Sequence, residues 1–148
     1  MRRGLLLVAL VLAACATTGQ AERIAALSPY ASELYARYAQ FMTEAQRDTF
    51  LRAASDAERH AQVEGLKIDE MLADFPKPVQ EAIWAQQILP GMSPAAVLLS
   101  WGSPWQREID ETPLRKEAIE RWYYQRNGKS ANVTFTNGVV SEYDDGQR

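Results

Sequence analysis

Residues 119–140 read IERWYYQRNGKSANVTFTNGVV, and two Asn-Gly pairs separate runs in which apolar and polar residues alternate. Asn-Gly is the strongest short signal for a two-residue hairpin loop, because a type I′ turn requires positive φ at both central positions. Turns at Asn127–Gly128 and Asn137–Gly138 therefore predict a three-stranded antiparallel meander that begins near Ile119.

The two turns also predict how the strands pair. The first loop places Trp122 opposite Val133, and the second places Phe135 opposite Val140. Paired residues share a face of a sheet, so both turns place apolar side chains on one face, which we expect helices to cover. The opposite face is predicted to be polar and open to solvent or to a partner. It carries Arg121, Tyr123, Asn132, Thr134 and Ser141.

Before the sheet, the chain is predicted to be almost wholly helical from residue 29 to residue 88. Serine and threonine side chains can accept hydrogen bonds from the free N–H groups at a helix start, and proline suits the first helical position. Helix starts are assigned to Ser28-Pro29, Thr43, Ser55 and, closer to the sheet, Ser93-Pro94. Further helices are predicted over residues 68–75 and 78–88.

These elements together predict an α+β fold. A helical N-terminal region is expected over residues 28–77. Residues 78–148 are expected to form an ααβββ domain, in which two short helices pack on the three-stranded antiparallel meander. A chain of this size has room for one such domain with a modest core, but not for two large domains.

The N-terminus has the pattern of a signal peptide. Arg2 and Arg3 precede an apolar run over residues 5–14, which is followed by the only cysteine, Cys15. The run is too short for a permanent transmembrane helix, which needs about 20 residues. Residues 1–14 are therefore predicted to be a cleaved signal peptide, and residues 15–27 a tether.

Residues 12–15, Leu-Ala-Ala-Cys, resemble a bacterial lipobox. The resemblance implies that the Cys15 thiol receives a lipid, and several acyl chains on one residue would give stable anchoring. Alanine rather than aspartate at position 16 points by lipoprotein sorting rules to the outer membrane, with the protein facing the periplasm. The alternative is an ordinary secretory peptide followed by a chance free cysteine.

Composition limits the partners and the source of stability. Without residues 1–14, which include Arg2 and Arg3, the 16 basic residues fall to 14 against 19 acidic ones. An acidic chain of this kind is not expected to bind nucleic acid. Once Cys15 is acylated, no thiol is left for a disulfide, so packing alone must stabilise the fold.

Residues suited to catalysis or metal binding are few. His60 is the only histidine, and with Glu64 it would supply only two ligands of a metal site. The adjacent carboxylates Asp110–Glu111 and Asp144–Asp145 are predicted to be solvated loop charges. We expect no enzyme activity, metal or cofactor, since an enzyme would need Asp110, Glu111 and His60 to meet in one pocket.

The last 60 or so residues resemble the SmpA/OmlA family of BamE-type outer-membrane lipoproteins. The matching motifs are Gly91-Met92-Ser93, Trp101-Gly102-Ser103-Pro104, Trp122-Tyr123-Tyr124, Val133-Thr134-Phe135 and Asn137-Gly138-Val139-Val140. The resemblance implies a helix pair on a three-stranded antiparallel sheet and an accessory role in inserting β-barrels into the outer membrane. The long helical region over 29–88 departs from typical members, which are shorter.

A binding surface is predicted from aromatic residues and from the polar sheet face. Trp84, Trp101 and Trp105 are expected around the connection between helices and sheet, and Trp105 is the best candidate for exposure. The candidate interaction surface comprises Trp105, Arg107, Arg121, Tyr123 and Asn132. A flat exposed face would favour a protein partner in the envelope. A deep apolar cleft lined by the three tryptophans would favour the alternative, a ligand-binding or inhibitor-type periplasmic lipoprotein.

Overall fold

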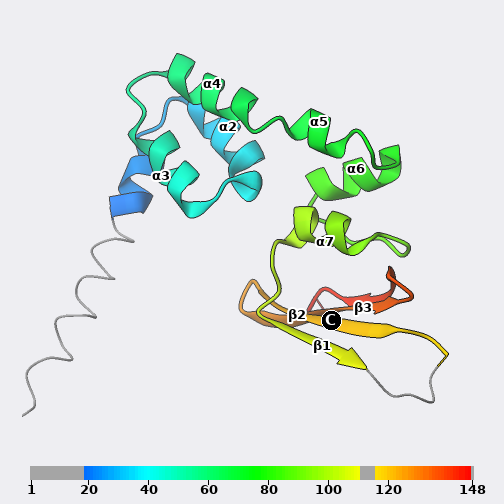
Figure 1. Cartoon of the computed structure of the whole chain (residues 1–148). Coiled ribbons are helices and arrows are strands. Elements are labelled where there is room, and N and C mark those ends of the chain that lie inside the picture. The colour runs from blue at the N-terminus through cyan, green and yellow to red at the C-terminus, as the bar shows by residue number, and fades with distance from the viewer. Residues whose placement is uncertain (1–18, 111–115, 148) are drawn as a thin grey trace, which may run out of the picture. The chain divides into compact units, whose positions relative to one another are not determined.

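A computed structural model of the chain describes residues 19–110 and 116–147 (Figure 1). The chain divides into two compact units, of which the first ends at Ile68 and the second begins at Asp69. The signal peptide and Cys15 lie outside the described residues, so both remain predictions. Within the described ranges, no helix is long and apolar enough to cross a membrane.

The first unit is helical. Its elements are a helical segment at residues 19–25, α2 (Pro29–Tyr38), the short 3-10 helix η1 (Ala39–Phe41), α3 (Glu44–Arg52) and α4 (Asp56–Gly65). The segment at 19–25 falls within the expected tether, and its alanine, glutamine, glutamate and arginine residues are good helix formers. Arg23 joins it to α3 through an ion pair with Asp48 at 2.9 Å.

Polar caps start the helices of this unit as predicted. The Ser28 hydroxyl accepts from the Ala31 N–H at 3.1 Å. At α3 the capping box is complete, because Thr43 Oγ1 accepts from the Gln46 N–H while Gln46 Oε1 accepts from the Thr43 N–H. The helices enclose a small core of Met42, Phe50, Leu51 and Val63, which Leu27, Leu34, Tyr35, Tyr38 and Leu66 surround.

The second unit places helices on one face of a sheet (Figure 1). Its helices are α5 (Ile68–Leu72), which starts at the boundary, α6 (Lys77–Trp84) and α7 (Pro94–Trp101). Ser93 caps α7 as predicted. The prediction that the preceding helix reaches Ile88 was wrong, because Gln86 adopts a left-handed φ of 54°. The Gln87 N–H then bonds back to the Ala82 carbonyl at 2.8 Å and closes α6 at Trp84.

The sheet has four antiparallel strands in the order β1-β2-β3-β4. They are β1 (Gln106–Asp110), β2 (Ile119–Arg126), β3 (Lys129–Thr136) and β4 (Val139–Asp144). The three-strand prediction was therefore wrong, although the α+β class is confirmed. The added strand, β1, lies at an edge, where its mostly polar sequence gives little sign of a buried face.

The predicted turns and pairings of the other three strands are confirmed. Both Asn-Gly pairs have positive φ at both residues, as type I′ turns require. Trp122 lies opposite Val133 and Phe135 opposite Val140, and all four are buried. A bulge follows in β4, where Thr134 pairs with Glu142 and Ser141 is the extra residue.

The apolar face of the sheet is the core of the second unit. Ile83, Ile88, Met92 and Val97 from the helices and their connection are also buried. The connection between α6 and α7 is bonded to β4, because the Gly91 N–H donates to the Val140 carbonyl and the Val140 N–H donates to the Met92 carbonyl. The other face of the sheet is left for the polar residues.

Candidate interaction face

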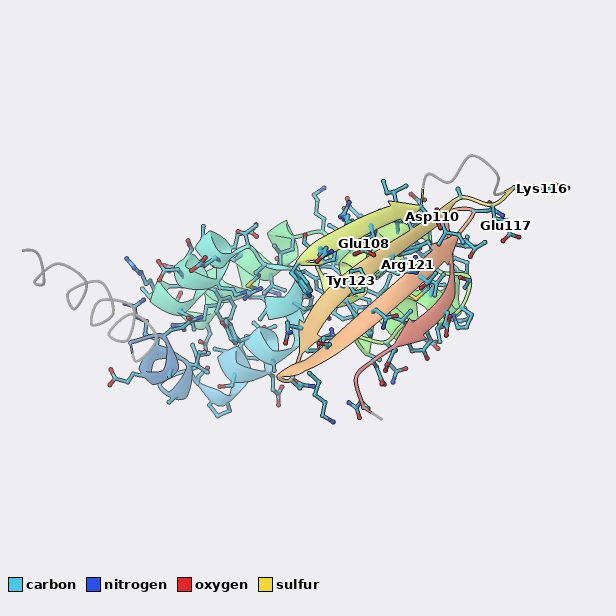
Figure 2. All side chains as sticks on the ribbon, turned by 90° about the horizontal axis from the view of Figure 1, so that it is seen from below. Glu108, Asp110, Lys116, Glu117, Arg121 and Tyr123 are labelled. Atoms are coloured by element: carbon cyan, nitrogen blue, oxygen red, sulfur yellow. The ribbon has the colours of Figure 1, made fainter. Side chains whose placement is uncertain are left out.

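Polar side chains from all four strands share the sheet face opposite the buried Trp122, and we call this the open face. Its central residues are Glu108, Arg121, Tyr123, Asn132, Thr134 and Glu142. The register places Glu108 opposite Arg121, and Tyr123 opposite Asn132. Figure 2 shows Glu108, Arg121 and Tyr123 on adjacent strands of this face. The open face is therefore a continuous four-stranded surface.

Tyr123 and Glu108 form a hydrogen-bonded pair across β1 and β2. The Tyr123 hydroxyl donates to Glu108 Oε2 at 2.8 Å, and Gln106 Nε2 donates to the other carboxylate oxygen at 2.8 Å. The bond to Glu108 raises the pKa of Tyr123, with a smaller contribution from desolvation, and the nearby Arg121 opposes the shift. The phenol is therefore held as a neutral donor.

Trp105 extends this face at the start of β1. Its side chain is 64% exposed, and its ring centroid lies 6.2 Å from that of Tyr123. The Trp105 N–H donates to the Tyr123 carbonyl at 3.0 Å, which fixes the backbone beside β2. A large exposed indole is thus held next to a phenol on the open face.

Arg121 supplies a positive charge at the centre of the open face. Although it lies opposite Glu108, its guanidinium forms no ion pair or hydrogen bond within the described part of the chain. An arginine fork can bind a carboxylate through two parallel hydrogen bonds. The guanidinium is therefore available to an acidic group of a partner.

Arg107 does not join the other four residues of the predicted surface. The register places it opposite Trp122, on the helix-covered side, and its guanidinium carbon lies 4.2 Å from the centre of the Trp122 ring. Glu108, which was not among the predicted residues, occupies the open face instead. Polar residues at every second position, Gln106, Glu108 and Asp110, could have placed Glu108 on the open face. That pattern can be interpreted only once β1 is known to be a strand.

The three tryptophans near the connection do not line a common cleft. Trp101 borders a cleft of about 520 Å³ in the second unit, and neither Trp84 nor Trp105 is among its lining residues. Trp105 lies instead beside Tyr123. Among the described residues, the three indoles therefore do not line the shared apolar cleft that would have favoured the ligand-binding alternative.

The residues considered for catalysis are explained by local contacts. His60 Nδ1 is hydrogen-bonded to the Tyr30 hydroxyl at 2.6 Å, and its Nε2 lies 3.3 Å from Glu64 Oε1. Asp144 and Asp145 accept hydrogen bonds from the backbone of the C-terminal turn. Glu111 lies outside the described residues. Within those that are described, no three His, Cys, Asp or Glu side chains are grouped to hold a metal.

Comparison of the chain with protein-family models, with curated proteins and with solved structures finds no match. A function must therefore be argued from the residues of the site. The strongest feature is the exposed Trp105 beside the Tyr123–Glu108 pair, with Arg121 close by on the same face. These groups suit the recognition of a surface better than the transformation of a substrate.

Proposed function

We propose that this chain is a lipid-anchored envelope protein whose open face binds a partner protein. The exposed indole of Trp105 beside Tyr123 carries the proposal. Tryptophan, tyrosine and arginine are the residue types most enriched at the energetic centres of protein interfaces, and all three occur here together. The lipid on Cys15 would hold the protein at the outer membrane, facing the periplasm.

The partner we propose is another envelope protein, and components of the β-barrel assembly machinery are the first candidates. The resemblance to the SmpA/OmlA family suggests this class. Support comes from the arrangement of α6 and α7 on one face of an antiparallel sheet, which leaves the other face free for contact. The role is one of binding rather than catalysis.

The open face suggests how such a partner would be held. Trp105 supplies apolar area, Tyr123 and Glu108 form a hydrogen-bonded rim, and Arg121 offers a charge for a partner carboxylate. Burial of the indole would contribute most to affinity, while the arginine would favour partners with an acidic group at the matching position.

Site-specific crosslinking tests the proposal in cells. A photoreactive amino acid in place of Trp105 should capture β-barrel assembly components or other envelope proteins, whereas one in place of Tyr30, an exposed aromatic of the first unit, should not capture the same set. If the proteins crosslinked to position 105 include no envelope protein, the proposal is ruled out.

Affinity for the captured partner gives the quantitative test. Trp105→Ala and Arg121→Ala should each weaken binding by tenfold or more, which corresponds to about 1.4 kcal/mol or more. Arg107→Ala is the matched control, because the same change is made on the other side of the sheet. Equal effects of Arg107→Ala and Arg121→Ala would show that the open face is not the binding surface.

A further inference from the structure

A second site lies in the same unit, at the cleft beside Trp101. It has a volume of about 520 Å³ and is lined by the connection after α6, the end of α7, the β2–β3 turn, β4 and the C-terminal turn. This volume falls within the range of about 300–1,000 Å³ that small-ligand sites occupy. The cleft does not include the open-face residues, so its argument is independent of the proposed function.

Three contacts fix the indole in this cleft. Trp101 Nε1 donates to the Gln86 carbonyl at 2.9 Å, and the ring meets Tyr124 edge to face with centroids 5.3 Å apart. The Arg126 guanidinium carbon lies 4.4 Å from the ring centre. Because these groups already hold the ring, a ligand that packs against it would not have to order it first.

Unused hydrogen-bonding groups line the cleft around this ring. The side-chain amides of Gln86, Gln87 and Asn127 form no hydrogen bond with other described residues, and neither does the Tyr143 hydroxyl. Each amide offers two donor hydrogens and one acceptor oxygen, and the phenol offers one donor and one acceptor. The site therefore presents both donors and acceptors, as a ligand with hydroxyl groups requires.

The cleft is lined by two residues of opposite charge. Arg126 and Asp145 both line it, and among the residues that the structure describes they are its only charged ones. The C-terminal turn approaches β3 closely at Gly146, where an added Cβ would lie 2.7 Å from the Ser130 carbonyl oxygen. An anionic ligand would meet Asp145 and a cationic ligand would meet Arg126, so the balance favours a neutral ligand.

We propose that this cleft binds a neutral saccharide. Sugar rings present apolar C–H faces that pack on aromatic rings, and their neighbouring hydroxyls both donate and accept, as the amides here require. The exposed Tyr143 supplies aromatic surface beside Trp101, whose ring Arg126 overlies, and Gln87 and Asn127 bind hydroxyl groups. A short peptide is the competing ligand, because its amides also pair with amide side chains.

Titration of the full chain with defined probes tests this site. The probes are the β-1,4-linked tetramer of N-acetylglucosamine, maltotetraose and tetraglycine, each added to the Cys15→Ser protein at millimolar concentration. We expect either saccharide to shift the Trp101 indole N–H resonance in a saturable way. Comparison of the two saccharides shows whether the cleft prefers N-acetylated amino sugars or unmodified glucose units. Binding of tetraglycine alone, or of no probe, overturns the proposal.

Variants locate the binding. Gln87→Ala and Asn127→Gly, which keeps the positive φ of the turn, should each weaken saccharide binding by fivefold or more. Gln125→Ala is the matched control, because Gln125 lies on β2 but is not part of the cleft. Unchanged affinity in both cleft variants overturns the assignment. Trp105 crosslinks should be unaffected by either variant, so failure here is distinct from failure of the partner model.

Discussion

Tyr123 and Tyr124 are neighbours in sequence but occupy opposite faces of β2. Tyr123 donates to Glu108 on the open face, whereas Tyr124 is only 4% exposed and donates to the Gly102 carbonyl at 3.2 Å. Burial raises the pKa of Tyr124 strongly, and the bond to Glu108 raises that of Tyr123. Two consecutive residues of β2 therefore lie in different surroundings, Tyr123 on the open face and Tyr124 in the core.

Alkaline conditions should reveal the buried phenol. The folded pKa of Tyr124 lies above the unfolded value of about 10, so its contribution to stability is complete below about pH 10 and is lost as the pH rises through the folded pKa. We predict that Tyr124→Phe costs about 1 kcal/mol near neutral pH, because one hydrogen bond is removed, and lessens the loss of stability above about pH 10. Urea unfolding across this pH range measures both effects.

The comparison for that series is Tyr123→Phe, which removes the phenol on the other face and leaves Tyr124 in place. The bond that raises the pKa of Tyr123 is exposed, so this variant should change the alkaline slope less. A Tyr124→Phe protein that loses stability as steeply as the parent would contradict the assignment.

Among the elements, those defined by local chemistry could be predicted from sequence. The Asn-Gly turns set the register of β2, β3 and β4, and hydroxyl caps set the starts of α2, α3 and α7. Strand β1 could not, because it is defined by pairing with β2 across the intervening residues. The end of α6 was missed for a similar reason, since nothing in the sequence marks Gln86 as left-handed.

The candidate surface follows the same division. Arg121, Tyr123 and Asn132 were placed together correctly, because alternation along a strand of known register fixes the face of each side chain. Arg107 could not be placed without β1. Trp105 precedes that strand, so the alternation that sets the face of Arg107 does not extend to Trp105. Glu108 was missed because β1 was not predicted.

The capping box of α3 should be measurable. Thr43→Ala removes the oxygen that accepts from the Gln46 N–H, and we expect a loss of about 1 kcal/mol in the free energy of unfolding. Thr49→Ala is the control, because Thr49 lies inside the same helix and its hydroxyl bonds only to the Ala45 carbonyl. Thermal or urea unfolding compares the two, and equal losses would show that the cap has no special role.

At the scale of the whole molecule, the chain contains two separate cores. Phe50 is fully buried in the first unit, and Trp122 is 2% exposed in the second. We predict that Phe50→Ala and Trp122→Ala each cost about 3–5 kcal/mol in their own unit. Hydrogen exchange should then show lost protection in α3 and α4 for the first variant and in the sheet for the second. Equal loss throughout the chain for both would indicate a single cooperative unit.

Anchoring is also a property of the whole chain. We predict that Cys15→Ser releases the protein from the membrane fraction and leaves it as an unacylated precursor, because acylation requires the thiol. Fractionation with mass spectrometry of the N-terminus measures the outcome. The control is Trp105→Ala, which should remain with membranes. Unchanged fractionation of Cys15→Ser would reject the lipid anchor.

The bulge in β4 means that this strand is one residue longer than a regular ladder would need. Removal of Ser141 should restore an even repeat while Tyr143 stays across from Val133, beside the cleft. Removal of Asn132 from β3 would instead invert the inside and outside positions of every residue on one side of the cut. The fold should thus tolerate deletion of one residue from the edge strand β4 but not from the central strand β3. The length of β4 can therefore vary, whereas that of β3 cannot.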